Sequence, residues 1–310
     1  MKKLLILSGK GGTGKTTVAA AFVSLAKARA FADCDVDAPN LHLVMHDLPV
    51  PAVKDYHGMG KAFVDEYKCI SCGICISHCR FEAIGKADNN AALVNPYACE
   101  GCGLCEALCP TKAISMVEDK AGDLMLYRIK EPDSQLQDNT TESDQVRDSV
   151  FSTAELKMGS GTSGKLVSEV KKQLSMAAPK DVELAVIDGS PGIGCPVIAS
   201  ITGVNFVLIV AEPSVSGISD MKRIIETALF FGVDIAVCTN KADTNLGRAA
   251  EIERFCGEHA LPFVGRIPYD SQVIEATNAG RSIDSTDGSA SYAVREVFRK
   301  VTDLLQIKEK

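Results

Sequence analysis

Short apolar runs alternate with longer mixed segments along most of this chain. The runs have strand length and are rich in Val, Ile and Leu, which is typical of strands buried on both faces of a parallel sheet. The segments between them have helical length, beginning with the alanine-rich stretch 16–28. Alternating strands and helices predict an α/β fold with a mainly parallel sheet covered on both faces. The predicted strands are 3–7, 182–188, 206–211, 235–238 and 262–266.

One region breaks this alternation. Residues 62–120 contain two runs of four cysteines, so we predict a small α+β insertion there, within a larger domain formed by residues 1–61 and 121–310. The stretch that follows, 131–148, is polar and acidic with few apolar residues. It predicts a solvated loop or a weak hairpin that is partly disordered.

The last segment of the chain is amphipathic with helical spacing. It has no Trp and no cationic face, so we predict a helix docked on its own sheet rather than one lying on a membrane. No apolar run in the sequence is long enough to span a bilayer. The apolar stripe of this helix consists of Val294, Val297, Phe298, Val301, Leu304 and Leu305.

Charge and composition narrow the function further. The 310 residues carry a formal net charge of −7 and no basic tract, which argues against nucleic-acid binding. Met1, Lys2 and Lys3 lead straight into a predicted strand without a leader-like segment, so a cytoplasmic location is expected. In that compartment, 12 cysteines favour metal or redox chemistry over disulfides.

Eight of the cysteines form two runs with the same spacing, C-x-x-C-x-x-C-x-x-x-C. This is the bacterial pattern for a pair of 4Fe–4S clusters, in which the fourth cysteine of each run binds the cluster of the other run. Zinc sites use paired C-x-x-C elements instead. Gly73, Gly101 and Gly103 give the backbone the freedom to pass close to sulfur. The first predicted ligand set is Cys69, Cys72, Cys75 and Cys109, and the second is Cys99, Cys102, Cys105 and Cys79.

A glycine-rich phosphate-binding loop follows the first predicted strand and opens the first predicted helix. Its backbone amides are expected to cradle phosphates, Lys15 to reach the β- and γ-phosphates, and Thr16 to coordinate Mg²⁺. Asp188 ends a buried strand, as in the Walker B pattern, and is expected to hold Mg²⁺ through water. The predicted nucleotide-binding residues of the loop are Gly9, Lys10, Gly11, Gly12, Thr13, Gly14, Lys15, Thr16 and Thr17.

The segment KGGTGKT resembles the deviant P-loop of the MinD/ParA-like ATPases, which include the nitrogenase iron protein and the Mrp-type iron–sulfur carriers. The resemblance implies that Lys10 reaches across a homodimer interface to the partner's nucleotide. It also implies a catalytic role for Lys10 and Lys15 in ATP hydrolysis, which is expected to be slow and stimulated by a partner. Residues 33–40 resemble switch I, where Asp35 orients or activates the attacking water close to Mg²⁺.

Further motifs follow in the order of that family. Residues 189–194 resemble switch II, and the resemblance places Asn240 and Pro268 against the adenine of ATP or ADP. Ser163-Gly164-Lys165 is either an ordinary helix start or a phosphate or interface element. Cys195, just after switch II, is interpreted as a small helix-start residue, with cluster ligation as the alternative.

Together the motifs indicate a MinD-like Mg-ATPase that carries a two-cluster ferredoxin insertion. The leading hypothesis is that nucleotide-dependent dimerisation is coupled to electron transfer to, or maturation of, an unidentified partner metalloprotein. A spatial-positioning ATPase with structural or sensing clusters is one alternative, and a cluster-assembly scaffold is another. An amidoligase of the cobyrinate a,c-diamide synthase type is disfavoured because the chain has no glutaminase domain.

Overall fold

The computed structural model describes residues 1–45, 48–132 and 146–307 of the chain. In this described part, one large sheet contains β1 (Lys2–Leu7), β2 (Ala30–Asp33), β3 (Ala52–His57), β8 (Lys120–Pro132), β9 (Val146–Leu156), β10 (Leu184–Asp188), β11 (Phe206–Ala211), β12 (Asp234–Asn240) and β13 (Phe263–Ile267). The strand order is β13-β12-β11-β1-β10-β2-β9-β8-β3. Neighbouring strands from β13 to β9 are parallel. The predicted α/β sheet is therefore confirmed.

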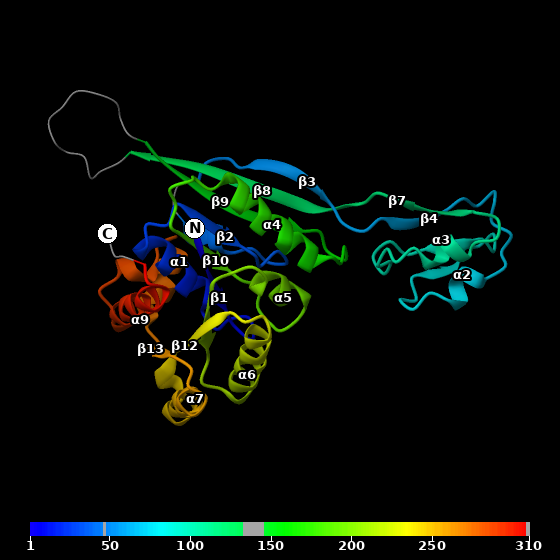
Figure 1. Ribbon diagram of the computed structural model, residues 1–310. Coiled ribbons are helices and arrows are strands. Elements are labelled where there is room, and N and C mark those ends of the chain that lie inside the picture. Colours follow the sequence, from blue (N-terminus) through cyan, green and yellow to red (C-terminus); the bar gives the residue numbers. More distant parts are fainter. Residues whose placement is uncertain (46–47, 133–145, 308–310) are drawn as a thin grey trace.

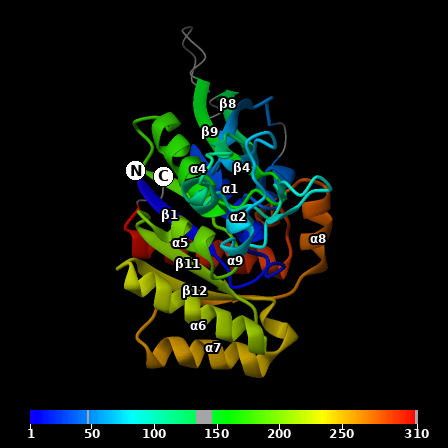
Figure 2. The same cartoon turned by 90° about the vertical axis from the view of Figure 1, so that its right-hand side faces the viewer.

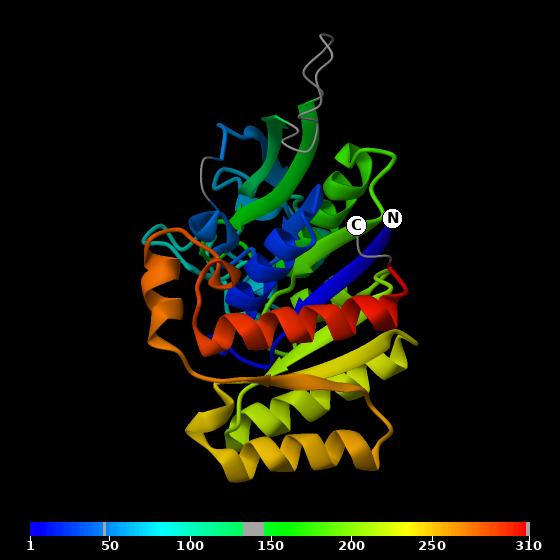
Figure 3. The same cartoon turned by 90° about the vertical axis from the view of Figure 1, so that its left-hand side faces the viewer.

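Helices cover both faces of the sheet, as the alternating sequence pattern predicts. One face carries α1 (Lys15–Leu25) and α9 (Ser289–Leu305), seen in front of the strands in Figure 3. The other face carries α4 (Ser163–Ala177), α5 (Cys195–Ile201), α6 (Val215–Phe230) and α7 (Leu246–Glu258). The shorter elements are α8 (Ser271–Asn278), η1 (Leu41–Val44), η2 (Ala242–Thr244) and η3 (Ile283–Ser285).

The apolar stripe of α9 docks on the sheet, which confirms the prediction for the last helix. Phe298 packs edge-on against Phe22 of α1, with ring centroids 5.1 Å apart. Leu304, which we expected on the same stripe, is instead 44% exposed. No helix among the described residues is long and apolar enough to cross a membrane. The fully buried stripe residues are Val294, Val297, Val301 and Leu305.

Beyond β9 the sheet continues as an antiparallel extension that the sequence pattern did not reveal. β8 pairs antiparallel with both β9 and β3. Tyr56 is the buried residue of β3, so no apolar run marks that strand. The polar stretch 131–148 enters the β8–β9 pairing at its two ends, while residues 133–145 lie outside the described residues. The pairing at both ends fits the weak-hairpin alternative.

The chain between β3 and β8 forms a small separate unit. An antiparallel ribbon of β4 (Lys61–Val64) and β7 (Ile114–Val117) leads away from the large sheet and carries this unit at its far end (Figure 1). Figure 2 shows the unit in front of the sheet. The remaining elements of the unit are β5 (Ile84–Lys86), β6 (Ala92–Val94), α2 (Ile74–Ser77) and α3 (Leu104–Leu108). The limits 62 and 120 of the insertion stay a prediction.

Candidate functional site

The glycine-rich loop connects β1 directly to α1. Gly12 and Gly14 have φ values of +80° and +89°, a region that favours glycine. A Cβ on Gly14 would also lie 2.2 Å from Nδ2 of Asn240, which donates a 2.6 Å hydrogen bond to the carbonyl of Thr13. Asn240, at the end of β12, therefore holds the backbone of the loop by this hydrogen bond. Only glycine fits at position 14.

A cleft of about 820 Å³ opens at the carboxyl ends of the central parallel strands, where ligands bind in open α/β sheets. Residues 10–17 of the loop line it, as do Asp35, Asn240 and Pro268. Gly9 lies instead against α6, where a Cβ would come 2.1 Å from Cβ of Asp220. The predicted nucleotide-binding residues other than Gly9 thus share one cleft, while their contacts with a nucleotide stay a prediction.

Asp188 brings the two functional side chains of the loop together. One carboxylate oxygen accepts a 2.5 Å hydrogen bond from Nζ of Lys15, and the other accepts a 2.7 Å bond from the Thr16 hydroxyl. Burial alone would lower the pKa of the Lys15 ammonium, but the facing Asp188 carboxylate outweighs burial and raises that pKa. Lys15 is therefore a charged group, and Asp188 and Thr16 are adjacent oxygens suited to Mg²⁺.

Switch I is folded around a second buried carboxylate, that of Asp33. It accepts hydrogen bonds of 2.9 Å from the backbone amides of Asp35, Asn40 and Leu41. Burial and the nearby Asp188 charge raise the pKa of Asp33 to about 7. Asp33 thus holds the loop that presents Asp35 to the cleft. Burial, with a contribution from the charge of Asp188, also raises the pKa of Asp35, to about 6.

Lys10 lies at the rim of the cleft and is held by groups that follow β11. Its Nζ forms a 2.6 Å ion pair with Glu212 and bonds of 3.3 and 3.4 Å with the hydroxyls of Ser214 and Ser216. Lys241 donates to the carbonyl of Gly12 at 2.8 Å and lies 3.9 Å from Glu212. The sequence motifs indicate no role for Glu212 or Lys241. The sequence signal that could have indicated their place at the cleft is their position directly after β11 and β12.

The cleft also has an apolar wall that the sequence analysis missed. Val273, Ile274 and Thr277 of α8 line it, together with Leu43 and Tyr269. Tyr269 directly follows Pro268, in the segment that the family resemblance places at the adenine. The other residues belong to no recognisable motif, because an apolar surface needs only side chains of suitable size.

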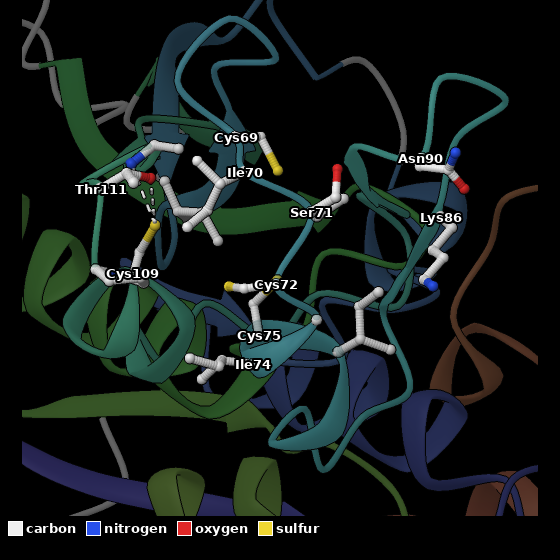
Figure 4. Close-up of a pocket in the computed structure, with 16 residues that line it drawn as sticks. Cys69, Ile70, Ser71, Cys72, Ile74, Cys75, Lys86, Asn90, Cys109 and Thr111 are labelled. Atoms are coloured by element: carbon white, nitrogen blue, oxygen red, sulfur yellow. Dashed lines mark hydrogen bonds between the residues drawn. The ribbon is translucent and has the colours of Figure 1, made fainter.

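Two hollows in the small unit each contain one of the predicted four-cysteine sets. The first hollow is lined by Cys69, Cys72, Cys75 and Cys109, shown in Figure 4. The second is lined by Cys79, Cys99, Cys102 and Cys105, and also by Cys75 of the first set. These are the two crossed sets that the spacing predicts. None of the twelve cysteines forms a disulfide.

The chemistry of each hollow fits a 4Fe–4S cluster. Each supplies the four thiol donors that such a cluster requires, and a backbone amide donates to the crossing sulfur in both cases. Ala83 donates to Sγ of Cys79 at 3.4 Å, and Ala113 donates to Sγ of Cys109 at 3.2 Å. In the described residues, no three His, Cys, Asp or Glu side chains converge on one point as ligands of a single metal ion. Ligation by the eight cysteines stays a prediction.

Both cysteine loops have the backbone that the glycine pattern predicts. Gly73, Gly101 and Gly103 have φ values of +75°, +71° and +74°. Gly73 and Gly103 directly precede α2 and α3, so each third cysteine sits in the first turn of a short helix. The sequence expectation that these glycines take unusual torsions is confirmed.

Comparison with known families supports both parts of this description. A family model described as a 4Fe-4S dicluster domain matches residues 62–116. The iron-sulfur cluster carrier protein of Methanocaldococcus jannaschii is 24% identical over 159 residues, which cover 47% of this chain and 54% of the carrier. The small unit is therefore a ferredoxin-type dicluster domain.

Solved structures match the fold over nearly the whole chain. The cell division ATPase MinD of Pyrococcus furiosus has a TM-score of 0.55 at 16% identity, covering 98% of this chain and 99% of that one. The septum site-determining protein MinD of Pyrococcus horikoshii OT3, solved with Mg-ADP, also has a TM-score of 0.55, at 17% identity, covering 100% of this chain and 99% of that one. The large domain therefore has the MinD-type P-loop fold.

One relative matches the chain from end to end. The uncharacterized protein MJ0578 of Methanocaldococcus jannaschii is 30% identical over 310 residues, which cover 98% of this chain and 97% of that protein. The chain therefore belongs to the same family as MJ0578, and it is a MinD/ParA-like P-loop protein with an inserted 4Fe-4S dicluster ferredoxin domain.

Proposed function

We propose that the protein binds and hydrolyses Mg-ATP and couples its nucleotide cycle to two iron–sulfur clusters that serve a partner metalloprotein. One observation carries this proposal. A single chain combines a P-loop cleft, in which Asp188 joins Lys15 and Thr16, with two hollows that each contain one predicted four-cysteine set. The MinD structure solved with Mg-ADP has the same fold around its nucleotide, which supports the choice of ligand.

The cleft residues have chemistry suited to phosphoryl transfer. The buried ammonium of Lys15 would neutralise phosphate charge, while Thr16 and Asp188 would hold Mg²⁺. Asp35 lines the cleft, and its raised pKa makes it a suitable group to orient the attacking water and accept its proton. Hydrolysis forms a bond between the water oxygen and the γ-phosphorus. It breaks the bond between the γ-phosphorus and the bridging oxygen, and that oxygen leaves as part of ADP.

Lys10 links this cleft to the proposed homodimer. In the structure its ammonium is paired with Glu212 of the same chain, at 2.6 Å. Reaching a nucleotide in the partner subunit would require Lys10 to leave Glu212, so this ion pair would oppose dimer closure until a more negative group replaces it. A triphosphate is such a group, because it carries more charge than one carboxylate.

The insertion supplies the redox part of the proposal. When bound, 4Fe–4S clusters supply one-electron transfer, and the two cysteine sets would hold them in neighbouring hollows of one small domain. The insertion leaves the large sheet between β3 and β8 and therefore follows switch I and precedes Asp188 in the chain. Movement of the nucleotide switches can be transmitted to it through the elements that it contacts.

Electron paramagnetic resonance tests the proposal directly. The protein, purified under anaerobic conditions with its clusters and reduced with dithionite, is measured with and without Mg-ATP. We expect two interacting cluster signals that change on addition of Mg-ATP, and no change with the Lys15→Ala variant. A cluster signal that is identical with and without bound Mg-ATP would contradict coupling, and the absence of any cluster signal would contradict the redox function.

A cluster carrier or assembly protein is the second candidate, and the similarity to the M. jannaschii iron-sulfur cluster carrier favours it. The two candidates differ in how firmly iron is held. A carrier is expected to transfer its iron to an apo-ferredoxin in an ATP-dependent manner. An electron donor is expected to retain its iron through repeated turnovers, as measured by the iron content after desalting.

A further inference from the structure

Residues 159–164, here called loop 159–164, comprise the loop before α4 and the first two residues of that helix, and they lie between the large domain and the second cysteine run. Its first glycine touches Tyr97, since a Cβ on Gly159 would lie 3.3 Å from Cδ1 of that ring. Its second glycine touches the residue after Cys99, since a Cβ on Gly161 would lie 2.6 Å from Oε2 of Glu100. The contacts flank Cys99, which belongs to the second predicted ligand set. The loop therefore packs against Tyr97 and Glu100 on the two sides of this cysteine.

The same loop is fixed to the large domain at its other end. Thr162 has a φ of +63°, and its carbonyl accepts hydrogen bonds from the amides of Lys165 and Leu166, at 3.0 and 3.1 Å, as α4 begins. Its hydroxyl lies 3.4 Å from the Tyr56 hydroxyl of β3. Displacement of the N-terminus of α4 would therefore move the loop, and the loop would move against Tyr97 and Glu100.

Helix α4 is joined to α5 by close backbone contact and by a buried lysine. A Cβ on Gly164 would lie 3.2 Å from the carbonyl oxygen of Cys195, the first residue of α5. At the other end of α5, Nζ of Lys171 donates to the carbonyls of Ala199, Ser200 and Thr202 at 2.8, 2.6 and 2.5 Å. Contacts at both ends of α5 make α4 and α5 one rigid pair.

Helix α5 in turn begins where switch II ends. Ser190 and Pro191 of switch II and Pro196 of α5 line the nucleotide cleft. The Ser190 hydroxyl also donates to the carbonyl of Cys34 in switch I. A continuous series of contacts thus runs from the nucleotide cleft through α5 and α4 to the second cysteine loop.

We propose that loop 159–164 is the element through which the nucleotide site positions the second cysteine loop, leaving the first loop unaffected. The inference rests on the proposed function and adds which of the two cluster sites responds. It assigns a positioning role to Gly164 at the α4–α5 contact and to Tyr97 at the loop contact. It also fits the glycines of the segment, because Gly159 and Gly161 have φ values of +74° and +60° and a Cβ on Gly164 would crowd the backbone carbonyl of Cys195.

Hydrogen–deuterium exchange of the cluster-loaded protein, with and without Mg-AMP-PNP, tests this inference. In the wild-type protein we expect slower exchange in the P-loop and a changed exchange rate in residues 98–103, but no change in residues 68–73. Tyr97→Ala should abolish the change in 98–103 and retain the P-loop protection. The matched control is Tyr67→Ala, because Tyr67 stands two residues before Cys69, as Tyr97 does before Cys99. Tyr67 is fully exposed, whereas Tyr97 is 72% exposed and packs against Gly159 with the rest of its ring.

A second pair of variants tests the α4–α5 contact. Gly164→Val places a branched side chain against the Cys195 carbonyl and should also abolish the response of 98–103. Gly257→Val is the matched control in α7, where a Cβ meets nothing within 4 Å, and it should keep the response.

The outcomes separate this inference from the proposed function. P-loop protection with a response in 98–103 that persists in both Tyr97→Ala and Gly164→Val would overturn the inference alone. Equal responses of 98–103 and 68–73 would also overturn it. If Mg-AMP-PNP does not slow exchange in the P-loop of the wild-type protein, the proposed function is overturned, and the inference with it.

Discussion

The loops that carry Cys69 and Cys99 have the same backbone but different surroundings. Each cysteine amide donates a 3.1 Å hydrogen bond to the carbonyl four residues earlier, at Asp65 in one loop and Asn95 in the other. The first loop faces outward, with Tyr67 fully exposed. The second packs against residues 59–61 and 159–161. The cysteine loop thus occurs twice in this chain, once facing outward and once packed against neighbouring segments.

A single pair of equivalent positions shows what docking requires. Ser71 and Gly101 both have positive φ, at +58° and +71°. A Cβ on Gly101 would lie 2.5 Å from the carbonyl oxygen of Gly60, whereas the first loop accommodates a serine at the same φ. Backbone conformation alone therefore does not require glycine here. The close approach of the connecting segment does.

The largest difference between the two copies is expected when one cluster is removed at a time. Cys72→Ser and Cys102→Ser should each remove roughly half of the bound iron, because each cluster needs all four thiolates. The response of the remaining cluster to Mg-AMP-PNP should persist in Cys72→Ser and disappear in Cys102→Ser. Iron analysis and electron paramagnetic resonance measure both effects. An equal response in the two variants would remove the functional distinction between the copies.

The second prediction concerns Ser71 and Gly101, which occupy equivalent positions in the two cysteine loops. Gly101→Ala should destabilise the protein by about 2 kcal/mol or more, since the left-handed conformation alone costs an alanine roughly 1–2 kcal/mol and the Gly60 carbonyl must also move. Ser71→Ala should change stability by less than about 0.5 kcal/mol. Urea unfolding of the cluster-loaded proteins under anaerobic conditions measures both values. Similar values for the two variants would show that the second loop is not held by this contact.

The third prediction concerns the α4–α5 pair, to which the second cysteine loop is connected by loop 159–164. Burial lowers the pKa of Lys171 from 10.5 to about 8. The charge of Lys3 lowers this pKa further, whereas Cys34 raises it by less than burial lowers it. Between those pH values the unfolded chain binds more protons than the folded one, so stability rises with pH. The stability of the wild type relative to Lys171→Met should therefore increase by on the order of 2 kcal/mol from pH 8 to pH 10.

Unfolding of both proteins in urea at a series of fixed pH values measures this difference. Below pH 8 the difference should be constant, because Lys171 is protonated in the folded and the unfolded chain alike. A difference that falls between pH 8 and pH 10 would show that the three carbonyl acceptors stabilise the ammonium more than burial destabilises it.

The smallest expected effect concerns the two tyrosines. Tyr97→Ala removes the contact of a 72% exposed side chain with Gly159 and should cost about 0.5 kcal/mol. Tyr67→Ala should be neutral, because a fully exposed side chain contributes little. Thermal unfolding measures both, with iron content as a control for cluster occupancy. A neutral Tyr97→Ala would indicate that the contact with loop 159–164 holds the second loop too weakly to transmit movement.

Much of the large domain follows from local sequence patterns. The five predicted strands correspond to β1, β10, β11, β12 and β13, and the P-loop lies between β1 and α1 as its motif requires. The parallel strands β2 and β9 are not predicted, because β2 is short and ends in Asp33 and β9 mixes polar with apolar residues. The antiparallel edge does not follow, because β3 exposes Val53, Lys54 and Asp55 and has no apolar run or alternation to mark it. Its pairing with β8 joins segments that are separated by the whole insertion, and such a contact leaves no local pattern.

The candidate sites also contain some features that local sequence patterns predict and others that they do not. The cysteine spacing predicts the two crossed sets that line the hollows, because the ligand geometry of a cluster constrains it. The roles of Glu212 and Lys241 were missed because each residue acts on the loop from a neighbouring strand end. The contact of Gly159 with Tyr97 joins two domains, so neither sequence segment indicates it alone.

The most direct test of the account is a redox titration of the cluster-loaded protein, followed by electron paramagnetic resonance, with and without Mg-AMP-PNP. Cys72→Ser and Cys102→Ser are titrated beside the wild type to assign the signals. The account predicts that the nucleotide shifts the midpoint potential of the second cluster and leaves that of the first unchanged. Two unchanged potentials in a protein that has bound the nucleotide would contradict it.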